Sequence, residues 1–153
     1  MNNSRKIEIL REIQNELELR KGSKAYFSED FVSIEYDFAN HYLYVNWKGY
    51  QTEGSVKQGC EKMLEALLHY KCQNILNDNT NVLGIWTPAA QWVGENWLPR
   101  MVEAGLKYFA WVYSPSMLSQ ISTNEALKHT PPINIVKTFY DLESAKRSLT
   151  AKK

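Results

Sequence analysis

Three polar residues that could form a binding site, Asn77, Asp78 and Asn79, follow a short apolar run in the segment NILNDNTNVLGIWTP. The apolar run predicts a short buried strand at 74–78, and open α/β sheets bind ligands at the carboxyl ends of such strands. Asn and Asp at this place can also close Asx-turns by accepting hydrogen bonds from nearby backbone N–H groups. We therefore take all three as candidate binding residues, with backbone capping as the alternative.

Aromatic side chains are the second feature with a chemical use. The chain has five tryptophans, and Trp86, Trp92 and Trp97 follow the polar run. Indole rings around a concavity suit a small apolar ligand or a protein partner, and their N–H groups set the orientation. Rings that fill the core are only packing, which is the role expected of Trp47 and Trp111 on predicted strands. Trp86, Trp92 and Trp97 are therefore candidate binding residues.

Residue patterns typical of catalysis are missing from the sequence. Asp78 has no second carboxylate or histidine at a spacing typical of acid–base or metal chemistry. Cys60 and Cys72 do not have the spacing of zinc or redox motifs, and no nucleophile–base pair or phosphate loop is present. We therefore expect no enzyme activity, no catalytic residue, no metal and no cofactor.

The composition is typical of one globular domain. The chain has 153 residues and 44% hydrophobic content, which is enough for one packed core. Lys and Arg number 18 against 17 Asp and Glu, a net charge of +1, without the basic stripe that nucleic-acid binding needs. The N-terminus has no signal-peptide pattern, and no apolar run reaches membrane-spanning length. We expect a cytoplasmic protein with no nucleic-acid partner and no membrane span.

An amphipathic helix is predicted ahead of this domain. Four apolar residues recur at helical spacing among charges across residues 4–21, and Gly22 follows as a stop. The four are Ile7, Leu10, Ile13 and Leu17. We assign residues 1–24 to this N-terminal helix and residues 25–153 to a single domain. We expect the helix to dock on its own domain, with pairing to another copy or to a partner as alternatives.

The first half of the domain combines a hairpin with a helix. Period-two alternation over residues 32–36 and 42–47, separated by the turn residues DFAN, predicts a β-hairpin. Ser55 and Gln58 have capping-box spacing ahead of an apolar stripe, so a helix is predicted from about 55 to 71.

The second half alternates helices with strands. Pro99 interrupts the apolar pattern of residues 88–104, so we predict two short helices, the first capped by Thr87 and the second by Asn96. The remaining predicted elements are a strand at 108–114, a helix with a capping box at Ser122 and Glu125, a strand at 133–140, and a last helix capped by Asp141. Strands separated by helices imply right-handed crossovers. The predicted fold class is α/β, with a mixed sheet, an N-terminal antiparallel hairpin and β/α crossovers.

Several of these segments together resemble a known superfamily. They are YLYVNWKGY in the hairpin, NILNDNTNVLGIW, AAQWVGENWLPRMVEAGLKYFAWVYSP, and the closing IVKTFYDLESAKRSL. Over about residues 26–150 the chain is similar to the SpoIIAA-like branch of the STAS superfamily, whose best known members are bacterial anti-sigma-factor antagonists. The branch shares its general architecture with CRAL-TRIO lipid-transfer domains. The resemblance implies a SpoIIAA-like fold, to which the N-terminal helix is an addition.

The resemblance also indicates a modification site. The antagonists carry a phosphorylatable serine at the N-terminus of the helix after the matching strand, in an Asp-Ser-Ser/Thr-Gly motif. A phosphate there meets free N–H groups and the positive end of the helix dipole, and it changes the charge that a partner meets. The matching segment here is TPAA at 87–90, which lacks that motif. Thr87 is the candidate phosphorylation site, and an ordinary N-cap is its alternative.

Two functional expectations follow from the residues and the resemblance. The first is a non-catalytic regulatory or protein-interaction module that presents the loop 79–92 to a protein partner. The alternative is a binder or carrier of a small apolar ligand in an aromatic pocket. Outward-facing rings of Trp86 and Trp92 would favour the partner, and rings around a closed void would favour the ligand. A homodimer through the N-terminal helix or an aromatic face is a further expectation.

Overall fold

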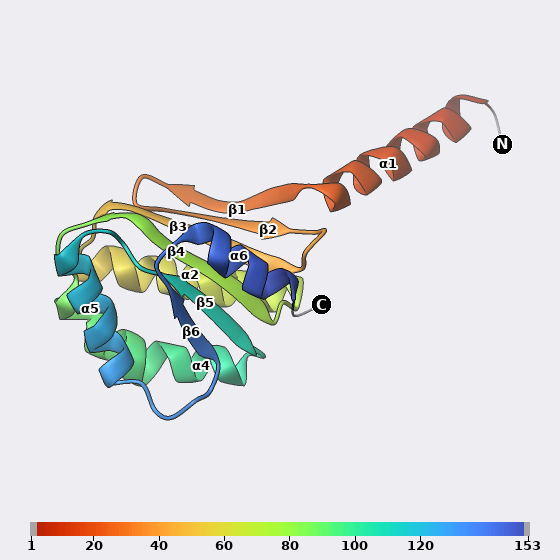
Figure 1. The fold of residues 1–153 in the computed structure, drawn as a ribbon. Helices are drawn as coiled ribbons and strands as arrows, with labels where there is room; N and C mark the ends of the chain where they lie inside the picture. The colour runs from red at the N-terminus through yellow and green to blue at the C-terminus, as the bar shows by residue number, and fades with distance from the viewer. Residues whose placement is uncertain (1–2, 152–153) are drawn as a thin grey trace.

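One mixed sheet forms the centre of the fold (Figure 1). The computed structural model describes residues 3–151, and within them the side chains outside residues 15–21. The strands are β1 (Ser23–Glu29), β2 (Val32–Asp37), β3 (Tyr42–Tyr50), β4 (Asn74–Leu83), β5 (Tyr108–Val112) and β6 (Val136–Phe139). They lie in sequence order, antiparallel from β1 to β3 and parallel from β3 to β6. The predicted α/β class with a mixed sheet is confirmed.

Helices cover both faces of this sheet. The helical elements are α1 (Asn3–Lys21), α2 (Glu53–Tyr70), α3 (Thr87–Trp92), the π-helical turn η1 (Val93–Trp97), α4 (Leu98–Glu103), α5 (Met117–Lys128) and α6 (Leu142–Thr150). The helices α2, α3, α4 and α5 and the turn η1 pack on one face, where the larger apolar core lies. Helix α6 packs over β4 and β5 on the other face. Helices between consecutive parallel strands confirm the predicted β/α crossovers.

The antiparallel part of the sheet is larger than predicted. The hairpin of β2 and β3 is confirmed, with its turn at 38–41. β1 precedes it as an edge strand that the sequence analysis missed. Its side chains are exposed or half-buried, and its register shifts between Ala25 and Phe27. The segment SKAYFSE therefore lacks the clean alternation by which a half-buried strand is recognised.

The start of α2 corrects the predicted capping box. Thr52 is the N-cap: its Oγ1 accepts a hydrogen bond from the Ser55 N–H at 3.0 Å, and the Ser55 Oγ accepts one from the Thr52 N–H at 2.9 Å. Ser55 therefore takes the third helical position of the box, where Glu or Gln commonly stands. The helix itself is confirmed, and it ends at Lys71, whose backbone is left-handed.

The two short helices predicted around Pro99 form one continuous helical run instead. The turn η1 joins α3 to α4, and the Leu98 N–H donates to the Val93 carbonyl five residues earlier. This wider turn accommodates Pro99, which has no N–H to donate, at the start of α4. Asn96 therefore lies inside the run rather than at a cap, and its Oδ1 accepts from Arg100 Nε at 3.0 Å.

Two further predicted caps are wrong. Thr87 is the first residue of α3, and Trp86 is the N-cap. The N-cap side chain makes no capping hydrogen bond to the first turn of α3. Ser122 lies in the middle of α5, where its Oγ accepts from the Trp86 N–H at 2.8 Å and donates to the Leu118 carbonyl. Ser122 thus ties α5 to the start of α3, across 36 residues of sequence. Local spacing cannot reveal such a partner.

The C-terminal elements follow the prediction with a shorter strand. β6 begins at Val136 because the preceding residues form a turn in which the Ile133 N–H donates to the Pro131 carbonyl. The predicted cap at Asp141 is confirmed, since its carboxylate accepts from the Ser144 N–H at 2.8 Å.

The N-terminal helix α1 extends away from the sheet (Figure 1). Three residues of its apolar stripe, Ile7, Leu10 and Ile13, are 55%, 65% and 48% exposed, and the fourth, Leu17, lies outside the described side chains. The expectation that this stripe docks on its own domain is wrong for the residues described. Within the described part of the chain, no helix is both long and apolar enough to cross a membrane.

Candidate functional site

The polar run from Asn77 to Asn79 lies in the middle of a strand rather than at its end. β4 continues to Leu83, five residues past the predicted end, so the three side chains alternate between the two faces of the sheet. Asn77 and Asn79 face α2, and Asp78 faces the side covered by α6. The expectation of one polar site at a strand end is therefore wrong.

Asp78 has a structural role on the α6 side. It is 2% exposed, and its Oδ2 accepts a hydrogen bond from the Tyr44 hydroxyl at 2.7 Å. Its Oδ1 accepts from the N–H and the hydroxyl of Thr80, so the Asx-type alternative is confirmed. Burial raises the pKa of Tyr44 well above its ordinary value, and the hydrogen bond to Asp78 raises that pKa further. Both carboxylate oxygens are thus already engaged within the fold.

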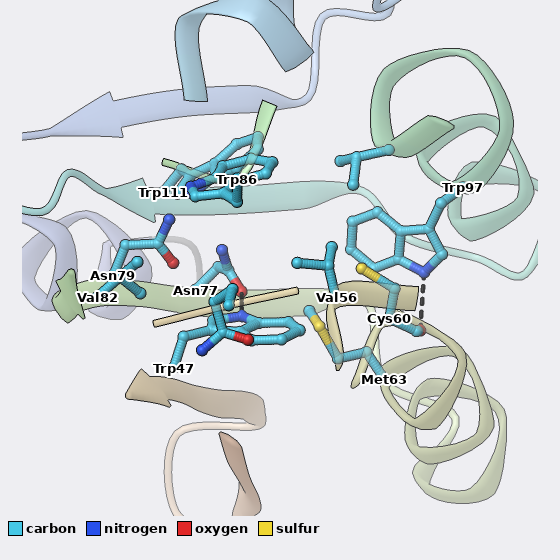
Figure 2. A pocket seen from close by; sticks show the side chains of 12 residues that line it. Trp47, Val56, Cys60, Met63, Asn77, Asn79, Val82, Trp86, Trp97 and Trp111 are labelled. Carbon is cyan, nitrogen blue, oxygen red and sulfur yellow. Dashed lines mark hydrogen bonds between the residues drawn. The ribbon is translucent and has the colours of Figure 1, made fainter. Parts of the chain in front are cut away.

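A cavity lies on the opposite side, between the sheet and the helical elements α2 and η1 (Figure 2). It is lined by Trp47, Gln51, Val56, Cys60, Met63, Asn77, Asn79, Val82, Trp86, Val93, Trp97 and Trp111. It leaves about 30 Å³ for the centres of water-sized spheres, which is room for about two water molecules. Its wall is mainly aromatic and aliphatic, with amide groups as its polar part.

Parallel strand register brings the sheet residues of this wall together. Asn77 on β4 pairs with Trp111 on β5 and with Val45 on β3, two residues before Trp47. Residues two apart on a strand share a face, so Trp47, Asn77, Asn79 and Trp111 all face the cavity. The rings of Trp86 and Trp111 stack with centroids 6.2 Å apart.

A glycine on α2 makes room for one of these rings. Gly59 packs against the Trp47 indole so closely that a Cβ atom on Gly59 would lie 2.7 Å from Trp47 Cζ3. Ordinary contacts between carbon atoms are about 3.5–4.0 Å. The absence of a side chain at Gly59 therefore lets Trp47 lie flat between β3 and α2, where it forms the floor of the cavity (Figure 2).

Three of the four cavity indoles have hydrogen-bond acceptors. Trp47 Nε1 donates to Asn77 Oδ1 at 2.9 Å, and Trp97 Nε1 donates to the Cys60 carbonyl at 2.8 Å. Trp86 Nε1 makes a longer bond of 3.4 Å to Ser119 Oγ. Trp111 is 3% exposed, and its Nε1 is a buried donor without a hydrogen-bond partner.

Trp92 lies apart from this cavity. Its ring is half-buried and contacts two cations. Lys57 Nζ lies 5.5 Å and Arg100 Cζ 5.8 Å from the ring centroid. Arg100 in turn forms a two-bond ion pair with Glu61. Hydrogen bonding to Arg100 lowers the pKa of Glu61 below its ordinary value. Trp92 therefore belongs to a surface contact between α2 and the α3–α4 run.

The candidates from the sequence thus separate into two groups. Asn77, Asn79, Trp86 and Trp97 line the cavity together, whereas Asp78, Thr87 and Trp92 do not. Trp47 and Trp111 are buried, as predicted, and they also line the cavity. Strand alternation places both on a face with other apolar residues, but only the register shows that this face is the one that carries Asn77.

The cavity wall carries no charged side chain. Its only ionisable group is the Cys60 thiol, whose pKa is raised well above its ordinary value by burial and, to a smaller extent, by Glu61. Among the side chains that the structure describes, no group of three or more His, Cys, Asp or Glu could hold a metal ion. The arrangement favours an uncharged occupant, because an unpaired ion is costly to bury.

The chain is similar in structure to a protein of known structure. No protein-family model matches the chain, and no curated protein matches it. The chain is similar to the crystal structure of an uncharacterized protein from the DUF3478 family, from Shewanella loihica PV-4, with 23% sequence identity and a TM-score of 0.45. The match covers 84% of this chain and 93% of that chain. That protein is described as having a SpoIIAA-like fold.

Proposed function

We propose that the chain binds a small, uncharged, mainly apolar molecule in the cavity. The observation that carries this proposal is the wall, in which four indole rings and three side-chain amides line one cavity. Trp86 is 6% exposed and faces that space, which is the arrangement expected for a ligand rather than for a flat protein interface.

The cavity size limits the ligand and its affinity. A space for about two water molecules accepts only a few heavy atoms unless a wall side chain moves. The best very small ligands gain about 1.5 kcal/mol per heavy atom, so a four-atom molecule reaches at most about 6 kcal/mol. This free energy corresponds to a Kd of tens of micromolar, on the order of 40 µM. A larger natural ligand would bind by displacing part of the wall.

Native mass spectra of the freshly purified protein, compared with its denatured mass, test the proposal. We expect an additional mass that is lost on denaturation. Val82→Ile should reduce the bound fraction, because Val82 lines the cavity and the added methylene enters it. Leu83→Ile is the matched control, since Leu83 is the next residue and is 50% exposed. A bound fraction that responds equally to both variants would place the ligand elsewhere.

A protein-interaction module is the second candidate function. Most of the predicted loop 79–92 is regular structure, because residues 79–83 belong to β4 and residues 87–92 form α3, and its contact with a partner stays a prediction. The observation that favours an interaction is the exposed stripe of Ile7, Leu10 and Ile13 on α1, and a second copy of the chain is the partner that we propose for it. Phosphorylation at Thr87 stays a prediction.

A further inference from the structure

The cavity wall includes a buried hydrogen-bond donor that has no partner. Trp111 Nε1 and Thr123 Oγ1 are the described buried side-chain atoms without a hydrogen-bond partner, and Trp111 is the one of the two that lines the cavity. An indole N–H can only donate. A buried donor left unbonded costs free energy, so an occupant that accepts this bond is favoured over one that does not.

The orientation of the Asn77 amide adds a second donor. Because the Trp47 indole N–H can only donate, the group facing it at 2.9 Å must be the Asn77 carbonyl oxygen. The Asn77 NH2 group therefore points away from Trp47. Figure 2 shows this nitrogen directed toward the Trp86 and Trp111 side of the cavity. Asn77 and Trp111 are also paired on adjacent strands and both line the cavity, so the two side chains are neighbours in its wall.

We propose that the cavity is selective for a neutral molecule with a carbonyl oxygen, which accepts hydrogen bonds from Trp111 Nε1 and the Asn77 amide. This inference rests on the proposed function, because it concerns the ligand of the same site. A carbonyl oxygen has two lone pairs and brings no proton that needs an acceptor. It therefore suits two donors better than a hydrocarbon, which would leave both unbonded, or a cation, which would add further donors.

Acetone and isobutene form the probe pair, since they share one shape and differ by a carbonyl oxygen in place of a methylene group. Each is titrated into the full-length ¹⁵N-labelled protein while the five tryptophan indole N–H signals are recorded. We expect acetone to move the Trp111 signal downfield, as a new hydrogen bond does. We also expect acetone to bind about tenfold more tightly than isobutene, the range of one neutral hydrogen bond.

Two variants assign the effect to this donor. Trp111→Phe keeps an aromatic ring beside Trp86 but has no N–H, so its affinity for acetone should fall toward that for isobutene, with the remaining preference due to the Asn77 amide. Trp92→Phe is the matched control, because Trp92 lies outside the cavity wall, and both affinities should remain unchanged. Each variant also identifies its own indole signal by loss. The comparison of the two probes on the unmodified protein stands even if Trp111→Phe does not fold.

The outcomes separate this inference from the proposed function. Equal binding of both probes, with cavity signals shifting alike, would overturn the carbonyl preference and leave the proposed function in place. Unchanged indole signals with both probes, together with an apo mass in native spectra, would mean that the cavity holds water only. That result would overturn both.

Discussion

Gly94 provides the sharpest test of how the helical run around the cavity is packed. It lies in η1 between the cavity residues Val93 and Trp97. A Cβ atom at this position would lie 3.0 Å from both His129 C and Thr130 N, and closer still to the Ala126 carbonyl oxygen. These are main-chain atoms at the C-terminal end of α5, so no side-chain rotation can relieve the overlap. Gly94→Ala must push η1 and α5 apart.

The size of the effect follows from two opposing contributions. Replacing glycine by alanine inside a helix ordinarily gains about 1 kcal/mol. Overpacking a well-packed interior costs about 1–3 kcal/mol, and we take the upper end because the backbone cannot yield. The net expectation is a loss of about 2 kcal/mol in the free energy of unfolding. For a chain of this length, this loss lowers Tm by about 4–8 °C.

Thermal and urea unfolding followed by circular dichroism measure this loss. Gly54→Ala is the matched control, because a Cβ there would meet only Thr52 Oγ1 at 3.8 Å, an ordinary contact. Gly54 lies in the first turn of α2, so this substitution should leave Tm unchanged or raise it slightly. If Gly94→Ala were as stable as the Gly54→Ala variant, the close approach of η1 to α5 would be wrong, and with it the position of this cavity wall.

Two other predictions concern Tyr44 and α1. Tyr44→Phe removes the hydrogen bond to the buried Asp78 carboxylate and should lower the unfolding free energy by about 1–2 kcal/mol at neutral pH, measured by urea denaturation. The pKa of Tyr44 is raised in the fold, so the stability that its neutral hydroxyl contributes is complete below about pH 10 and is lost as the pH rises further. Above about pH 10, Tyr44→Phe should therefore lose less unfolding free energy than the unmodified protein. Leu10→Glu should convert a dimer to a monomer in sedimentation velocity experiments, whereas Arg11→Glu should leave the dimer intact. A monomeric unmodified protein would refute self-association through α1.

Local sequence patterns were sufficient for most elements of the fold. Alternation over β2 and β3, the apolar stripe of α2 and the Asp141 cap all depend on residues within one turn or one strand pair, and all are confirmed. Pro99 predicts a break in the helix over residues 88–104, because the interior of a regular helix does not accommodate proline. The π-helical turn that accommodates it also packs Gly94 against α5, so this choice depends on a contact distant in sequence.

The sequence by itself determined an α/β domain with a mixed sheet and showed no catalytic pattern. The tertiary structure decided which polar residues share a site. Asn77, Asp78 and Asn79 look like the end of a strand because buried strands are usually apolar. They lie in a buried strand here because Trp47 and Tyr44, more than 29 residues away, supply hydrogen-bond donors on opposite faces. Such donors come into reach only when parallel strands pair, so local periodicity could not separate Asp78 from the cavity or place Trp111 beside Asn77.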